Sequence, residues 1–173
     1  GSGCYHTKQR LRATTSVRAS VNYTSKLGSL SVSGNYHAPN SFAIVALGFS
    51  KTNFGAIPLP FVIPGSTRAY SGACSILASL DILFAGTTNA SGTTSVNVPI
   101  PVDRQYGGVK LFMQLMSQDK DTPAAIDLVT ANGYEVQFVA PYDLAPVSRS
   151  YANNSLAATG AVTKNYGIVT AIF

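Results

Sequence analysis

Hydrophobic and polar residues alternate with a period of two along much of this 173-residue chain. From residue 11 to residue 23 the odd positions are mostly apolar and the even positions are polar or charged. This pattern is typical of a long strand with one solvated face. Segments 96–100 and 109–115 alternate in the same way, whereas 42–47 is a continuous apolar run. Such a run predicts a strand that is covered on both faces.

Two segments carry mixed signals. In 74–84 every even position is apolar, as in a strand, but the apolar residues also mark one helical face. We predict a strand, because no helix cap leads into this segment and its neighbours are strands. Segment 122–131 begins with Thr122-Pro123 and is followed by Asn132-Gly133. These are start and stop signals of a helix, so we predict one short helix there.

Short strands at a spacing of about ten residues, separated by Gly, Pro and Asn, predict an all-β fold, an antiparallel β-sandwich of immunoglobulin-like or jelly-roll-like form. We expect this module over residues 1–140, a polar linker over 141–160 and one extra C-terminal strand over 161–173. A strand that follows a linker can fold back onto its own sheet or add to the open edge of another copy. We expect the second arrangement. The residues expected at the subunit interface are Val162, Tyr166, Ile168, Ile172 and Phe173.

The composition excludes several classes of protein. Only 11% of the residues are charged and 46% are hydrophobic, whereas disordered chains combine high charge with low hydrophobicity. The apolar runs are far shorter than the roughly 18 residues of a membrane-spanning helix, so we expect no membrane insertion. The low charge also leaves few charged side chains to protect open strand edges.

The net charge of +5 is concentrated near the N-terminus, where Lys8, Arg10, Arg12 and Arg18 precede the first acidic residue, Asp81. Nucleic-acid-binding domains carry a denser basic stripe, so we expect no nucleic-acid partner. One interpretation is a solvated strand face that protects a sheet edge. The other is a polyanion contact, for example with an acidic cell-surface polysaccharide.

Cys4 and Cys74 are the only cysteines, and they form no C-x-x-C motif. In a chain rich in hydroxyl groups and poor in charge, this favours one disulfide made in an oxidising compartment. Two buried free thiols in a cytosolic protein are the alternative. Three glycosylation sequons, at Asn22, Asn89 and Asn153, matter only in a host that glycosylates secreted proteins.

Motifs for catalysis are missing from the sequence. There is no G-x-S-x-G elbow, H-E-x-x-H motif, Walker loop or dinucleotide fingerprint. His6 and His37 are the only histidines, and we expect each at the surface or in a loop. The one acidic cluster, Asp119, Asp121 and Asp127, lacks the EF-hand spacing and is interpreted as a solvated loop. We therefore expect no catalytic residue, no metal site and no cofactor.

Several short segments follow one another in a distinctive order. They are GSGC at 1–4, ALGFS at 46–50, IPLP at 57–60, GACSIL at 72–77, PIP at 99–101, VKLFMQ at 109–114 and ANG at 131–133. This order resembles a β-sandwich module found near the C-termini of secreted proteins of planctomycetes and similar bacteria. The resemblance covers residues 1–138 and implies a secreted β-sandwich, a Cys4–Cys74 disulfide and no catalytic residue. The basic N-terminal strand and the tail beyond Pro141 depart from the pattern.

Together these observations predict a non-enzymatic extracellular structural or adhesive protein, such as a pilin-like filament subunit that assembles with itself by strand donation. The alternative is a module of a secreted protein that binds extracellular polysaccharide or another polymer at the cell surface. A secreted enzyme with an unrecognised site is a third hypothesis.

Overall fold

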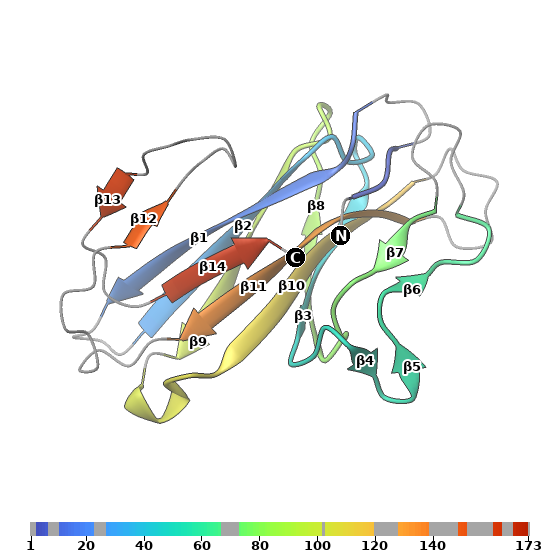
Figure 1. The fold of residues 1–173 in the computed structure, drawn as a ribbon. Helices are drawn as coiled ribbons and strands as arrows, with labels where there is room; N and C mark the ends of the chain where they lie inside the picture. The colour runs from blue at the N-terminus through green and yellow to red at the C-terminus, as the bar shows by residue number, and fades with distance from the viewer. Residues whose placement is uncertain are drawn as a thin grey trace.

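The structure is a computed structural model of the chain. It describes residues 3–6, 11–20, 27–66, 73–101, 103, 105–119 and 128–138, and the backbone of 21–22, 104, 149–151, 161–163 and 168–172. Nearly all of the regular structure is β, and the antiparallel sheets pack together as a sandwich (Figure 1). The predicted all-β sandwich is therefore confirmed.

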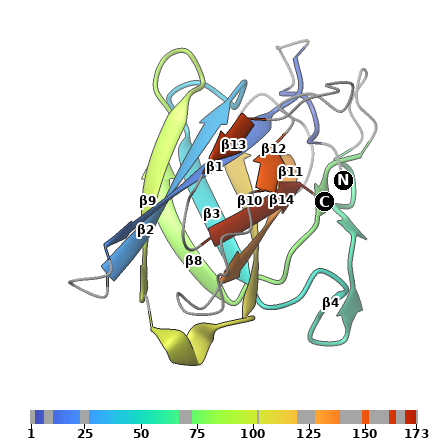
Figure 2. The same cartoon turned by 60° about the vertical axis from the view of Figure 1, so that its left-hand side comes forward.

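Two antiparallel sheets form the sandwich (Figure 2). The smaller sheet has the order β1-β2-β9, formed by Thr14–Asn22, Leu27–Asn35 and Thr94–Pro101. The larger has the order β14-β11-β10-β3-β8, formed by Ile168–Ile172, Leu128–Phe138, Lys110–Gln118, Phe42–Gly48 and Ile82–Thr87. Both sheets contain only antiparallel pairs.

Three small hairpin-like pairs and one helical turn lie outside the two sheets. The pairs are β4 (Asn53–Phe54) with β5 (Ile57–Pro58), β6 (Phe61–Val62) with β7 (Ser75–Ile76), and β12 (Arg149–Tyr151) with β13 (Ala161–Thr163). The turn is a 3-10 helix, Arg104–Tyr106. None of the helical structure in the described residues is long and apolar enough to cross a membrane.

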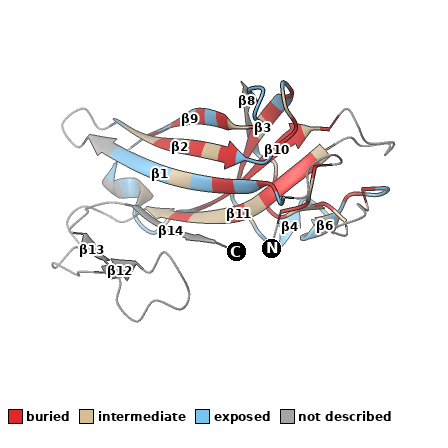
Figure 3. Ribbon diagram, turned by 90° about the horizontal axis from the view of Figure 1, so that it is seen from above, coloured by how far each residue is buried: buried red, intermediate tan, exposed pale blue. Residues whose placement is uncertain are grey.

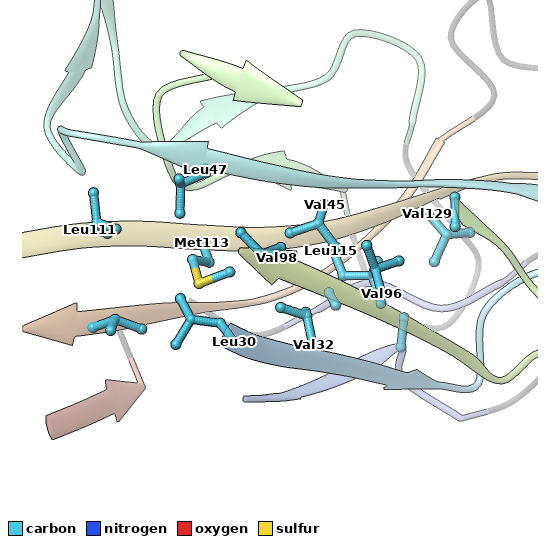
Figure 4. Packing of buried hydrophobic residues seen from close by; sticks show 14 of the residues in the cluster. Leu30, Val32, Val45, Leu47, Val96, Val98, Leu111, Met113, Leu115 and Val129 are labelled. Atoms are coloured by element: carbon cyan, nitrogen blue, oxygen red, sulfur yellow. The ribbon is translucent and has the colours of Figure 1, made fainter. Parts of the chain in front are cut away.

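The hydrophobic core lies between the sheets, where the buried residues of both gather (Figure 3). Strand β9 alternates strictly between buried and exposed positions, as its sequence predicts. The core includes Leu30 and Val32 of β2, Val96 and Val98 of β9, Val45 of β3, and Met113 and Leu115 of β10 (Figure 4). One face of each of these four strands thus lies in the core.

Strands β3 and β10 are buried on both faces, as the continuous apolar run at 42–47 predicts. Ala46 and Gln114 face away from the sandwich core and are nevertheless fully buried. The side chain of Gln114 is bonded to the segment around β7, because its Oε1 accepts from the N–H of Leu77 at 2.9 Å and its Nε2 donates to the C=O of Ser75 at 2.9 Å. That segment therefore covers the outer face of the larger sheet.

Three sequence predictions need correction. The strand predicted over 74–84 is two separate strands, β7 and β8, joined by a short irregular segment. The helix predicted over 122–131 is wrong at its C-terminal end, because 128–131 belong to β11, and its remaining residues lie outside the described ones. Pairing with β10 overrides the local signals here, since context outweighs propensity in strands. The single strand predicted over 161–173 is divided into β13 and β14.

Candidate functional site

Strand β14 adds to the free edge of β11. Five residue pairs join the two strands, from Tyr134 opposite Ile172 to Phe138 opposite Ile168. On its other side this stretch of β11 pairs with β10. Val136, in its middle, is fully buried and belongs to the hydrophobic core. The edge that β14 fills is therefore next to the core, and removal of β14 would expose an unpaired strand there.

The first half of the same β11 edge is covered by a different part of the chain. The N–H of Cys4 donates to the C=O of Thr130 at 2.8 Å, and the N–H of Thr130 contacts Cys4 Sγ at 3.2 Å. The C=O of Cys4 in turn accepts from the N–H of Ala13 at 3.0 Å. The N-terminal segment thus bridges the two sheets at one end of this edge, and β14 completes the other end.

A disulfide fixes this N-terminal segment. Cys4 and Cys74 are joined by an S–S bond of 2.05 Å across a sequence separation of 70 residues. This is the pairing that the resemblance implied, and both residues are buried. Such a bond persists in oxidising environments and is rare in the cytosol, so the chain belongs in a non-reducing environment.

The outer face of β11 carries a charged cluster beside the β14 edge. Glu135, which pairs with Ala171 of β14, accepts from Lys110 Nζ at 2.7 Å and from Lys51 Nζ at 3.0 Å. Hydrogen bonds from Lys110 and then from Lys51 hold the pKa of Glu135 below its usual value. Lys51 also lies 5.5 Å from the ring centroid of Phe112. This cluster connects the loop after β3 to the sheet.

The residues that the sequence predicts at the subunit interface are only partly described. Val162, Ile168 and Ile172 lie in β13 and β14, of which the structure describes the backbone. Tyr166 and Phe173 lie outside the described residues. The structure therefore places Ile168 and Ile172 in one strand with a defined register on β11, and Val162 in a different two-stranded sheet.

Of the predicted basic contact, Arg18 is exposed on β1 and Arg12 is exposed two residues before that strand begins, whereas Lys8 and Arg10 lie outside the described residues. The guanidinium of Arg12 lies 5.6 Å from the ring centroid of Tyr5. Because β1 is an edge strand of the smaller sheet, its basic residues occupy the position expected of edge protection.

The structure describes the three glycosylation sequons to different extents. Asn89 is exposed in the turn between β8 and β9, where its Oδ1 accepts from the N–H groups of Ser91 and Thr93 at 3.0 Å each. Asn22 is described by its backbone alone, and Asn153 lies outside the described residues.

Both histidines lie outside the strands, as the prediction of a surface or loop position allows, but both are buried, so a surface position is wrong. His6 Nε2 lies 3.0 Å from Asp119 Oδ1, and His37 Nδ1 lies 3.0 Å from Ser117 Oγ. Asp119 is itself fully buried, which also corrects its predicted place in a solvated loop; Asp121 and Asp127 lie outside the described residues. The physical reason is that a carboxylate and an imidazole can be buried together when they pair.

Burial sets the chemistry of His37. Desolvation is the largest effect and lowers its pKa to about 4, while the Thr14 backbone acts in the opposite direction and His6 lowers the pKa further. Among the described residues, no group is a partner of hydrogen-bond geometry for His37 Nε2. With zero exposure, this imidazole is a neutral core group that a substrate does not reach from solvent.

No group of three or more His, Cys, Asp or Glu side chains in the described part of the chain could hold a metal ion. The fold and the site define a disulfide-bonded all-β sandwich whose larger sheet ends in an added C-terminal strand. Comparison with known proteins finds no protein family that matches this chain, and no similar curated protein or solved structure.

Proposed function

We propose that this protein is a non-enzymatic extracellular structural or adhesive subunit that assembles with copies of itself by donating β14 to the β11 edge of a neighbour. The observation that carries the proposal is the position of β14: it follows a long connection from β11, and it completes an edge beside the core residue Val136. In the single chain, β14 occupies its own edge, and a neighbour's β14 would form the same pairs.

The connection to β14 has the length that such an exchange requires. Residues 139–167 separate β11 from β14, and an extended chain covers about 3.3 Å per residue, so β14 can reach a neighbouring subunit. Within this connection β12 and β13 pair with each other and with no strand of the sandwich that the structure describes. Exchange of an identical element between copies is a low-cost route to assembly, because the native pairs are kept.

The proposed location is outside the cell. The Cys4–Cys74 disulfide supports a non-reducing environment, and the resemblance to the secreted module of planctomycete-type proteins supports secretion. We propose membership of that module class on the same grounds, for residues 1–138.

Negative-stain microscopy and sedimentation velocity of the full chain test the proposal. We expect the unmodified protein to form oligomers of more than two chains. We expect Ile168→Asp to lose them, because it places a charge opposite Phe138 where β14 pairs with β11. Ile57→Asp is the matched control, because Ile57 is 43% exposed in β5, outside the two sheets of the sandwich. Unchanged oligomers in Ile168→Asp would overturn strand donation.

A second candidate function is binding of an acidic extracellular polysaccharide through β1. The observation in its favour is that Arg12 and Arg18 are both exposed at this sheet edge. Retention on a heparin column tests it: Arg12→Ala/Arg18→Ala should elute at lower salt than Lys51→Ala/Lys110→Ala, which removes the same charge elsewhere. Equal elution of the two variants would contradict this candidate.

A further inference from the structure

Strand β8 is the opposite edge of the larger sheet. It pairs with β3 on one side, and no described strand pairs with it on the other. Ile82 is 42% exposed and Leu83 is 54% exposed, although both are large apolar residues. The strand carries no charge, whereas exposed edges are normally protected by charged side chains.

The nearest acidic side chain does not protect this edge either. Asp81 precedes β8, but its Oδ2 accepts from the N–H of Phe49 at 2.9 Å and from Ser79 Oγ at 2.6 Å. These bonds hold the carboxylate in the turn that leads into the strand. An unpaired, uncharged and apolar strand is a site for the addition of another strand.

We propose that β8 pairs antiparallel with β8 of a second copy of this chain, about a two-fold axis normal to the sheet. The direction of the strands favours this arrangement. All neighbours in the five-stranded sheet are antiparallel, so its outer strands β14 and β8 run in the same direction. Joining a β14 edge to a β8 edge with the core faces aligned would make a parallel pair, which is less stable per residue. The two-fold axis instead makes an antiparallel pair.

The hydrogen bonds around β8 select a register. The C=O of Thr87 already accepts from Thr94 Oγ1 at 2.7 Å, which leaves Ile82 to Gly86 as the open stretch, centred on Phe84. A two-fold axis normal to the sheet keeps the outward-facing residues of both copies on the same face. One residue of β8 must then lie opposite its own copy across the axis, and Phe84, at the centre of the open stretch, is that residue. Ile82 then lies opposite Gly86 of the second copy and Leu83 opposite Ala85, so these two large side chains each meet a small one, while Phe84 lies opposite Phe84 of the second copy.

Charge favours a second copy at this edge and disfavours it elsewhere. Two chains of net charge +5 repel each other, and the repulsion is weakest where both surfaces are uncharged. No like charges meet in a β8 pair. Phe42 of the adjacent β3 is 49% exposed and, by the register with Thr87, lies on the same outer face as Leu83. It adds apolar area to the contact.

Sedimentation velocity of the full chain over a concentration series tests this pairing. The background is Ile168→Asp, which removes the donated-strand contact and leaves β8 unchanged, so the two proposals can fail separately. In this background we expect a dimer, and we expect Leu83→Lys to weaken it at least tenfold. Leu27→Lys is the matched control, because Leu27 is 64% exposed on β2 of the other sheet.

Ala85→Lys is a second edge variant at an exposed position, and it decides the test if Leu83→Lys does not fold. Circular dichroism checks that each variant retains its β structure. A dimer that survives in a folded lysine variant at either edge position would overturn the proposal, and so would a chain that stays monomeric at every concentration in the Ile168→Asp background.

Discussion

The side chain of Asn132 on β11 takes the place of a strand beside Thr15 of β1. Its Oδ1 accepts from the N–H of Thr15 at 2.9 Å, and its Nδ2 lies 3.5 Å from the C=O of Thr15. β1 is the edge of the smaller sheet, so this amide satisfies backbone groups that no other described strand pairs with. It also joins the two sheets just before the stretch of β11 that pairs with β14.

Asn132→Ala should therefore destabilise the fold. The N–H of Thr15 would lose its partner at a buried position, which costs about 1–3 kcal/mol. Urea unfolding measures the free energy of unfolding, and Asn97→Ala, at an exposed position of β9, is the matched control. Equal stability of the two variants would contradict the bridging role of Asn132.

Gln114→Ala should have a larger effect. Besides its bonds to Leu77 and Ser75, Nε2 of Gln114 donates to the C=O of Ala131 at 2.8 Å, so three buried or half-buried backbone groups depend on one side chain. We expect a loss of roughly 3 kcal/mol or more of unfolding free energy. Hydrogen exchange should show faster exchange of the Leu77 amide. Unchanged protection of that amide would show that the covering segment is held by other contacts.

Loss of the disulfide should also destabilise the protein. Cys4→Ser/Cys74→Ser opens a loop of 70 residues, for which the chain-entropy model gives about 4 kcal/mol. We expect a lower urea midpoint under oxidising conditions, and the same midpoint for the variant and for the reduced unmodified protein. If the variant were as stable as the oxidised protein, the N-terminal segment would be held by its hydrogen bonds alone.

Acid should destabilise the fold through His37. Its pKa falls from 6.5 in the unfolded chain to about 4 in the folded one, so the unfolded state binds the proton first as the pH falls. The titration of His37 leaves the free energy of unfolding unchanged above about pH 6.5. Between about pH 6.5 and pH 4 it lowers that free energy by roughly 3 kcal/mol in total. The neighbouring His6–Asp119 pair is present both in the unmodified protein and in a His37→Gln variant, so a difference in pH dependence between the two reports on His37. Urea unfolding at several pH values should therefore give a smaller pH dependence for His37→Gln, and an equal one would refute this assignment.

The regular part of the fold could be predicted from the sequence because its signal is local. Alternation alone places Val96, Val98 and Ile100 in the core, and the unbroken apolar run at 42–47 predicts the doubly covered strand β3. These predictions hold because a strand's side chains alternate between faces whatever its neighbours are.

The polar interior could not be predicted, because its partners are far apart in sequence. His37 is bonded to Ser117, 80 residues away, and nothing near either residue marks them as buried. Asn132-Gly133 has the sequence of a helix stop, yet it lies within β11, where Gly133 is opposite Gln114. Only the folded sheet shows that Asn132 and Gln114 substitute for missing backbone partners.

A cysteine pair across β11 and β14 tests the central claim, strand donation, most directly. Gln137 and Val169 are opposite each other in the ladder, so Gln137→Cys/Val169→Cys should form a disulfide whichever chain supplies β14. Gln137→Cys alone is the control. Our account predicts a ladder of covalent oligomers of the double variant on a non-reducing gel, which collapses to a single band on reduction. A double variant that forms its disulfide only within one chain would contradict it.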